Sequence, residues 1–223
     1  MLRVRRAERG RSAAAALLLA AAALPLAVGA EQEQAGGAAT FTQLSGLRAV
    51  FMRRVDEEGY RLCAAPAIER GDAARMVRYL PQRNAIVIGA AAARGAQGLP
   101  QSADYAWSFV HELGHWWQYC RQLARPQSYG AENGAERIAL AFWREREPRI
   151  AQAMVQGAQI TLQLLPDPLA AGESPQVWFD AHPEALAQDG SARWLQAQMI
   201  ATLSREQPAP SFHKALSQPL FPW

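Results

Sequence analysis

The sequence predicts an α+β fold that is mostly helical and contains one small sheet. Long segments carry apolar residues at helical spacing, and one pair of short, β-branched segments flanks a turn. The chain has 223 residues, of which 50% are hydrophobic and 19% charged. This is the composition of a globular chain rather than a disordered one, and the length suits one domain. We therefore expect one compact domain over residues 41–223.

The first 30 residues have the pattern of a secretory signal peptide. Basic residues up to Arg11 lead into an uncharged apolar run from Ala13 to Leu26, and small residues precede Glu31. This order predicts cleavage after Ala30 and export to the periplasm or the medium. The uncharged stretch could also just span a bilayer, so an uncleaved anchor is the alternative.

The charge balance of the mature chain argues against nucleic acid as a partner. Five of the 23 basic residues and one of the 20 acidic residues lie in the signal segment, which leaves 18 basic and 19 acidic side chains. No basic excess remains to bind a phosphate backbone. No later apolar stretch approaches 18 residues, so we expect no stable membrane insertion after cleavage.

The first predicted elements of the mature chain are a tail, a helix and a hairpin. Residues 31–40 are polar and rich in Gly and Ala, which predicts a flexible N-terminal tail. Residues 42–57 carry apolar side chains at helical spacing and end before Gly59. Residues 76–80 and 85–89 flank a Pro-containing turn, and the second segment is rich in β-branched residues, which predicts a hairpin.

Five helices are predicted after the hairpin. Ser102 is a suitable N-cap for the first, and Pro126 and Pro148 mark boundaries between those that follow. The predicted helices cover residues 102–123, 131–147, 149–165, 181–187 and 191–206. A proline-rich tail follows, and the tryptophans, including Trp116, Trp117 and Trp143, are expected in the core.

The first of these helices contains the motif His111-Glu112-Leu113-Gly114-His115. Two histidines four residues apart lie about 40° apart around a helix and one turn apart along it, so both imidazoles can bind one ion. Zinc accepts imidazole nitrogens and keeps one of four positions for water in catalytic sites. Glu112 can reach that water without being a ligand, and it could accept its proton as a general base. The motif therefore predicts a Zn²⁺ site held by His111 and His115.

A third ligand must come from another element, and the next helix offers two acids. Glu132 and Glu136 lie about 40° apart on one face of that helix. Carboxylates at this spacing repel each other by a few tenths of a kcal/mol, and a cation together with an imidazole N–H would remove the repulsion. The alternative is that both acids lie on a solvated face.

The pair of segments HELGH and ENGAE resembles the gluzincin branch of the zincin metallopeptidases. It is also similar to small exported bacterial metallopeptidase-like proteins. The resemblance implies that Glu132 is the third ligand and that Glu136 orients a ligand histidine. The acid at 136 is Glu where Asp is commoner, so the reverse assignment stays open. The resemblance further implies that strand 85–89, directly before the motif helix in sequence, pairs with substrate backbone.

Two further residues could stabilise an oxyanion. His182 follows Asp180-Ala181, and in related enzymes a downstream His or Tyr donates a hydrogen bond to the oxyanion. The alternative for His182 is a local bond at a helix end beside Pro183. Tyr129, three residues before Glu132, is the second candidate.

Cys63 and Cys120 are the two cysteines of the chain. An even pair in an exported protein predicts a disulfide. The alternative is two small buried hydrophobic residues that never meet.

The functional prediction is an exported zinc metallopeptidase that acts on a peptide or protein substrate. One alternative is a catalytically silent protein of zincin fold that binds zinc or a partner. Another is a hydrolase of a non-peptide amide, such as a cell-wall crosslink, which would use the same metal chemistry.

Overall fold

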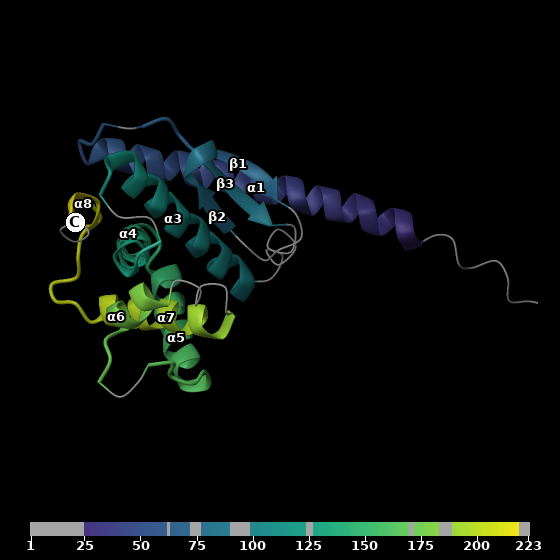
Figure 1. Ribbon diagram of the computed structural model, residues 1–223. Helices are drawn as coiled ribbons and strands as arrows, with labels where there is room; N and C mark the ends of the chain where they lie inside the picture. Colours follow the sequence, from purple (N-terminus) through teal and green to yellow (C-terminus); the bar gives the residue numbers. More distant parts are fainter. Residues whose placement is uncertain are drawn as a thin grey trace, which may run out of the picture.

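A computed structural model of the chain describes residues 25–61, 63–71, 77–89, 99–123, 127–169, 172–182 and 189–218. It confirms a mostly helical α+β fold with a single three-stranded sheet among these residues (Figure 1). Residues 1–24 of the predicted signal peptide lie outside the described residues. None of the described helices is both long and apolar enough to cross a membrane.

The first helix, α1 (Pro25–Glu57), ends where predicted and begins much earlier. Gly59, just past its end, has φ 81°, a left-handed conformation that glycine adopts without strain. The backbone of residues 31–40 is helical rather than the predicted irregular tail. That segment is rich in alanine, glutamine and glutamate, which favour a helix. Because it lacks large apolar residues at helical spacing, its sequence pattern did not predict one. The N-terminal part of α1 projects beyond the other elements (Figure 1), whereas Leu44 and Phe51 are buried in the core.

The sheet contains the predicted hairpin and one strand that was not predicted. Strands β2 (Val77–Leu80) and β3 (Ala85–Gly89) pair antiparallel through a 3₁₀ turn that ends at Asn84. Strand β1 (Ala67–Gly71) pairs parallel with β3, so β3 is central and β2 is an edge strand. The sequence did not reveal β1 because Ile68 is its only large apolar residue. Its pairing with β3, rather than its own pattern, makes it a strand.

The central helices lie within a few residues of their predicted positions. They are α3 (Leu99–Arg121), α4 (Tyr129–Arg146), α5 (Pro148–Leu164) and α7 (Asp189–Ser204). Helix α3 lies between the sheet and α4, and α5 and α7 pack on the far side of α4 (Figure 1). The motif helix is therefore covered on both sides.

Two short helices differ from the prediction. Helix α6 (Pro175–Ala181) precedes the predicted segment 181–187, of which residues 183–187 lie outside the described residues. The Ser174 side chain accepts a hydrogen bond from the Val177 N–H and begins α6. Helix α8 (Phe212–Ser217) forms within the proline-rich tail, since Ser211 caps it and Phe212 is completely buried.

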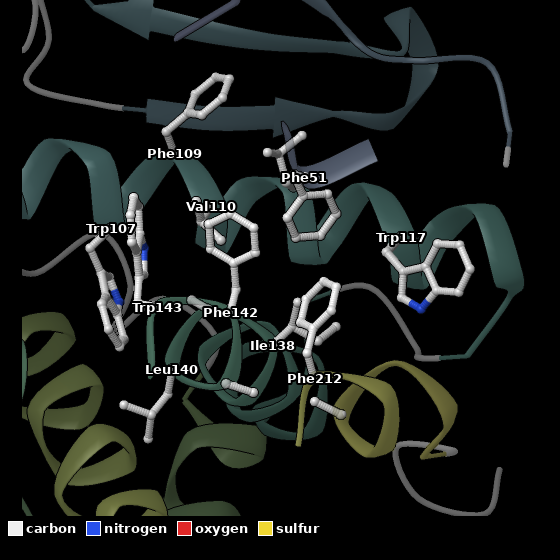
Figure 2. Packing of buried hydrophobic residues seen from close by; sticks show 14 of the residues in the cluster. Phe51, Trp107, Phe109, Val110, Trp117, Ile138, Leu140, Phe142, Trp143 and Phe212 are labelled. Carbon is white, nitrogen blue, oxygen red and sulfur yellow. The ribbon is translucent and has the colours of Figure 1, made fainter. Parts of the chain in front are cut away.

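The core gathers aromatic side chains around α3 and α4 (Figure 2). The rings of Phe51 from α1, Phe142 from α4 and Phe212 from α8 lie 5.5–5.6 Å apart. Trp116, Trp117 and Trp143, which we expected in the core, are buried. These contacts hold the two helices that carry the predicted metal ligands in one rigid unit.

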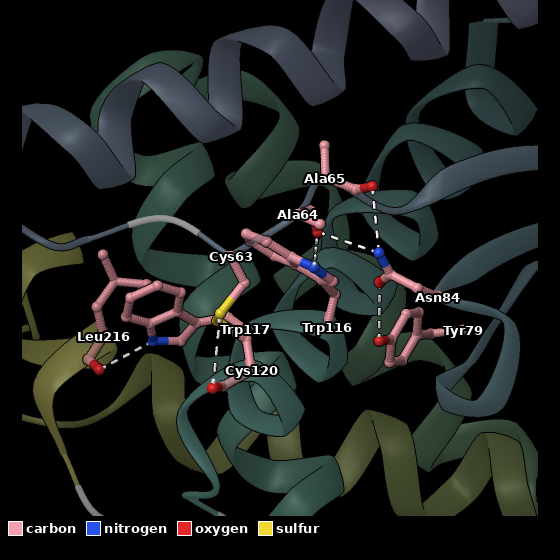
Figure 3. The surroundings of a disulfide bond; sticks show 9 residues. All are labelled: Cys63, Ala64, Ala65, Tyr79, Asn84, Trp116, Trp117, Cys120 and Leu216. Carbon is pink, nitrogen blue, oxygen red and sulfur yellow. Dashed lines mark hydrogen bonds between the residues drawn. A yellow bond between two sulfur atoms is a disulfide. The ribbon is translucent and has the colours of Figure 1, made fainter.

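A disulfide joins Cys63 to Cys120, as the sequence predicted (Figure 3). It ties the segment before β1 to the last turn of α3. The Trp116 indole donates a hydrogen bond to the Ala64 carbonyl at 3.0 Å, and Asn84 donates to the same carbonyl. This end of α3 is thereby fixed against the sheet.

Candidate metal centre

The two histidines of the motif face each other on one side of α3. Their Nε2 atoms are 3.0 Å apart, and the rings meet edge to face. His111 is 7% exposed, while His115 and Glu112 are partly buried. His111, Glu112 and His115 form a group of side chains that could hold a metal ion.

Glu132 of α4 completes a triangle with the two imidazoles. Its Oε2 lies 3.3 Å from the Nε2 of His111 and 3.3 Å from the Nε2 of His115. An ion with tetrahedral ligands at 2.0–2.1 Å holds neighbouring donor atoms about 3.3–3.4 Å apart. The triangle therefore has the size expected of three ligands of one tetrahedral ion.

The close approach of α3 and α4 depends on Gly114, between the two histidines. A Cβ atom at this position would lie 3.0 Å from the Cα and 3.2 Å from the carbonyl oxygen of Ala135. Both atoms belong to the α4 backbone, which cannot rotate aside as a side chain can. The glycine of HELGH and the alanine of ENGAE therefore set the spacing that brings Glu132 to the histidines.

Glu136 lies one turn after Glu132 and is completely buried. Its Oε1 is 3.0 Å from the Nδ1 of His111 and accepts a hydrogen bond from Gln196 at 2.7 Å. Its Oε2 accepts a hydrogen bond from the Trp107 indole at 2.8 Å. The Nδ1 of His111 is not aligned for a regular hydrogen bond, so its attraction to Glu136 is mainly electrostatic. Glu136 thus lies on the opposite side of the His111 ring from Glu132, which favours an orienting role for Glu136 over a ligand role.

Gln118 orients His115 as Glu136 orients His111, a role that the sequence did not reveal. Gln118 is 3% exposed, and its Oε1 lies 3.2 Å from the Nδ1 of His115. Its Nε2 donates a hydrogen bond to the carbonyl of Ala131 at 2.8 Å, one residue before Glu132. The only sequence feature that indicates this role is a polar residue three positions after the second histidine. Gln118 links the orientation of one candidate ligand to the position of another.

Glu112 lies next to the two histidines, with a carboxylate oxygen within 4.8 Å of a ring nitrogen of each. Its Oε2 accepts a hydrogen bond from the backbone N–H of Tyr79 on β2 at 2.7 Å. Burial raises the pKa of Glu112, and the positive charge that His115 and His111 carry when protonated opposes that rise. The bond from Tyr79 holds one carboxylate oxygen of Glu112 against β2.

The carboxylates around the histidines determine how the site titrates without metal. Burial alone would lower the pKa of His111, but Glu136 and Glu132 outweigh it and raise that pKa well above its usual value. The pKa of His115 is also raised, because Glu132 outweighs burial. Burial would raise the pKa of Glu132, but the two imidazoles hold it well below its usual range. The cluster is therefore built to hold positive charge, whether from protons or from a cation.

The two residues proposed for an oxyanion contact lie near the start of α4 and the end of α6. The Nδ1 of His182 lies 2.7 Å from the Trp178 carbonyl, and its ring stacks on Trp178. This is the local bond considered as the alternative role for His182. The backbone N–H of Tyr129 donates to Asp180, and its ring packs on Phe179. These contacts are with Trp178, Asp180 and Phe179 rather than with the histidine pair, so the catalytic roles of His182 and Tyr129 stay predictions.

Comparisons with protein-family models, curated proteins and solved structures found no match to this chain. The assignment of a function therefore depends on the geometry of the site itself.

Proposed function

We propose that the protein is a zinc-dependent peptidase of gluzincin type. The observation that carries this proposal is the triangle of His111 Nε2, His115 Nε2 and Glu132 Oε2, whose sides of 3.0, 3.3 and 3.3 Å suit a tetrahedral ion. Two imidazoles and one carboxylate suit zinc better than magnesium or calcium, which prefer more oxygen ligands. Bound zinc would supply a polarised water and a Lewis acid for a carbonyl group.

Glu112 would act as the proton carrier of the reaction. Its carboxylate would accept a proton from the attacking water, hold it at one oxygen, and deliver it to the leaving amine. The Tyr79 N–H bonds Oε2 and would leave Oε1 for that exchange. Burial, which raises the pKa of Glu112, brings its proton affinity closer to that needed near neutral pH.

An extended peptide is the substrate we favour, with one correction to the expected strand. Strand β3 (85–89) was expected to pair with substrate, but it is hydrogen-bonded to β1 on one side and β2 on the other. It has no free edge. Strand β2 is an edge strand, and the Tyr79 N–H that donates to Glu112 is directed away from β3. Substrate pairing is therefore proposed for β2, beside the general base.

We also propose that the protein functions outside the cytoplasm. The support is the pattern of residues 1–30 together with the Cys63–Cys120 disulfide, a bond that persists mainly in oxidising compartments.

Replacement of Glu112 by Gln separates an enzyme from a silent zinc-binding protein. Gln keeps the size of the side chain but cannot accept the proton of the water. Zinc content and folding should survive, while hydrolysis of a diverse peptide library falls about 10²- to 10⁴-fold. Glu57→Gln is the matched control, because Glu57 is an exposed acid on α1 that pairs only with Arg54 among the described residues.

Two results would count against the peptidase. Cleavage by Glu112→Gln at the wild-type rate would remove Glu112 from the reaction. A folded, zinc-loaded wild-type protein that cleaves no peptide, tested alongside amide-crosslinked cell-wall material, would favour either the silent binding protein or the non-peptide amidase, according to whether the crosslink is cut.

A further inference from the structure

A small cavity adjoins the metal centre on the side of α6 and α7. Its volume is about 180 Å³, which is room for one side chain. Its lining joins three groups of the metal centre to side chains of the two C-terminal helices: His111, Glu132, Glu136, Phe179, Ala192, Arg193, Leu195, Gln196 and Met199. Because His111 and Glu132 belong both to this lining and to the ligand triangle, a side chain in the cavity would be next to the reacting group.

Phe179, Leu195 and Met199 form an apolar part of the cavity wall. The three residues are each 1–2% exposed, so they form a rigid surface that offers no hydrogen bond through their side chains. Such walls favour the hydrocarbon part of an occupant and disfavour a polar group at that depth.

The two acids of the lining already have polar partners within the protein. Both oxygens of Glu136 accept hydrogen bonds, from Gln196 and from Trp107, and one of them also faces His111. Glu132 faces the two histidines. The Gln196 amide nitrogen donates its hydrogen bond to Glu136.

Arg193 is the remaining charged residue of the cavity lining. It is exposed, and no ion pair joins it to an acid among the described residues. A guanidinium at the open end of an apolar cavity binds a carboxylate through paired N–H donors and repels a cation.

We propose that this cavity selects substrates that place a carboxylate on a short apolar stem beside the scissile bond, with Arg193 as the specificity-determining residue. The carboxylate belongs either to an acidic side chain or to the C-terminus of the peptide, since both present the same group to Arg193. The apolar stem lies against Phe179, Leu195 and Met199. Cleavage of such a substrate rests on the proposed peptidase function. Binding of its carboxylate rests on the cavity alone.

The test uses peptides that differ in one residue, either Glu, Gln or Lys, each made with a free and with an amidated C-terminus. Cleavage is measured with the zinc-loaded wild type, Arg193→Gln and Arg193→Glu. Binding of the same peptides is measured by calorimetry with zinc-loaded Glu112→Gln, with and without the Arg193 changes. Arg205→Gln is the control, because it removes an exposed arginine just past the end of α7.

The wild type should prefer the carboxylate-bearing peptide about fivefold, the strength expected of a partly exposed ion pair. Arg193→Gln should lose this preference through KM, Arg193→Glu should favour Lys, and Arg205→Gln should behave as wild type. A preference for Glu over Gln and Lys that survives amidation assigns the carboxylate to the side chain. A preference for the free C-terminus over the amide, shared by the three peptides, assigns it to the C-terminus. Equal treatment of Glu, Gln and Lys together with no effect of amidation, or a preference unchanged in Arg193→Gln, would overturn the proposal. Carboxylate binding that depends on Arg193 without any cleavage would keep the cavity assignment and reject the peptidase instead.

Discussion

A methyl group added at Gly114 should weaken metal binding without touching any ligand. The new Cβ would lie 3.0 Å from the Cα of Ala135, whereas carbon atoms in contact normally stay about 3.5–4.0 Å apart. Helix α4 would have to recede by about 0.5–1 Å. The 3.3 Å separations between Glu132 and the two histidines would then approach about 4 Å, which exceeds the spacing that a tetrahedral zinc allows.

Two effects on stability oppose each other in Gly114→Ala. Overpacking of a close contact costs about 1–3 kcal/mol, and the upper part of this range applies because the α4 backbone must move. The higher helix propensity of alanine offsets about 1 kcal/mol. We expect a net loss of about 1–2 kcal/mol in the free energy of unfolding and about 10- to 100-fold weaker zinc binding, comparable to the loss of an orienting residue.

Gly157→Ala provides the matched control. Gly157 lies within α5, and a Cβ added there would have no heavy atom within 4 Å. This variant should gain about 0.5–1 kcal/mol and keep wild-type zinc affinity. The measurements are thermal unfolding and zinc competition against a chelator of known affinity. If Gly114→Ala binds zinc as tightly as Gly157→Ala and is equally stable, the close contact does not set the geometry of the site.

Three further predictions follow from the same geometry. Glu132→Ala should weaken zinc binding more than Glu136→Ala, whereas Glu136→Ala should destabilise the metal-free protein more, by about 2 kcal/mol, because it leaves buried donors of Trp107 and Gln196 unpaired. The opposite order in the zinc titration would make Glu136 the ligand. The pKa values of the two motif histidines are raised by the neighbouring carboxylates, so protons compete with zinc for the metal-free site. Zinc affinity should therefore rise with pH, by up to about tenfold per unit for each proton displaced, and a flat profile between about pH 6 and 8 would contradict this. Reduction of the Cys63–Cys120 bond, which joins residues 57 apart, should cost up to about 4 kcal/mol of stability and leave zinc content unchanged. Loss of zinc on reduction, measured at a temperature where the protein stays folded, would show that the bond also holds the site.

Elements with local signals could be predicted from the sequence, whereas elements that depend on a partner elsewhere in the chain could not. The long helices α3, α4 and α5 appear near their predicted bounds because apolar spacing and proline boundaries are local properties. Strand β1 and helix α8 were missed, since the first needs β3 as a partner and the second needs a pocket for Phe212. The β2–β3 hairpin was predicted because its signal is local. The central position of β3 was not predicted, because it depends on pairing with β1.

For the candidate site, the sequence by itself determined which side chains share a helix face. The spacing of His111 and His115 places two imidazoles one turn apart, and the spacing of Glu132 and Glu136 does the same for two acids. Only the tertiary structure decided how the two faces meet, because the contact of Gly114 with Ala135 sets the distance and rotation between α3 and α4. That contact brings Glu132 to the Nε2 edge of the histidines and places Glu136 behind His111. The roles of Gln118, Trp107 and Gln196 likewise exist only in the folded chain, since a hydrogen bond between residues far apart in sequence leaves no periodicity by which to predict it.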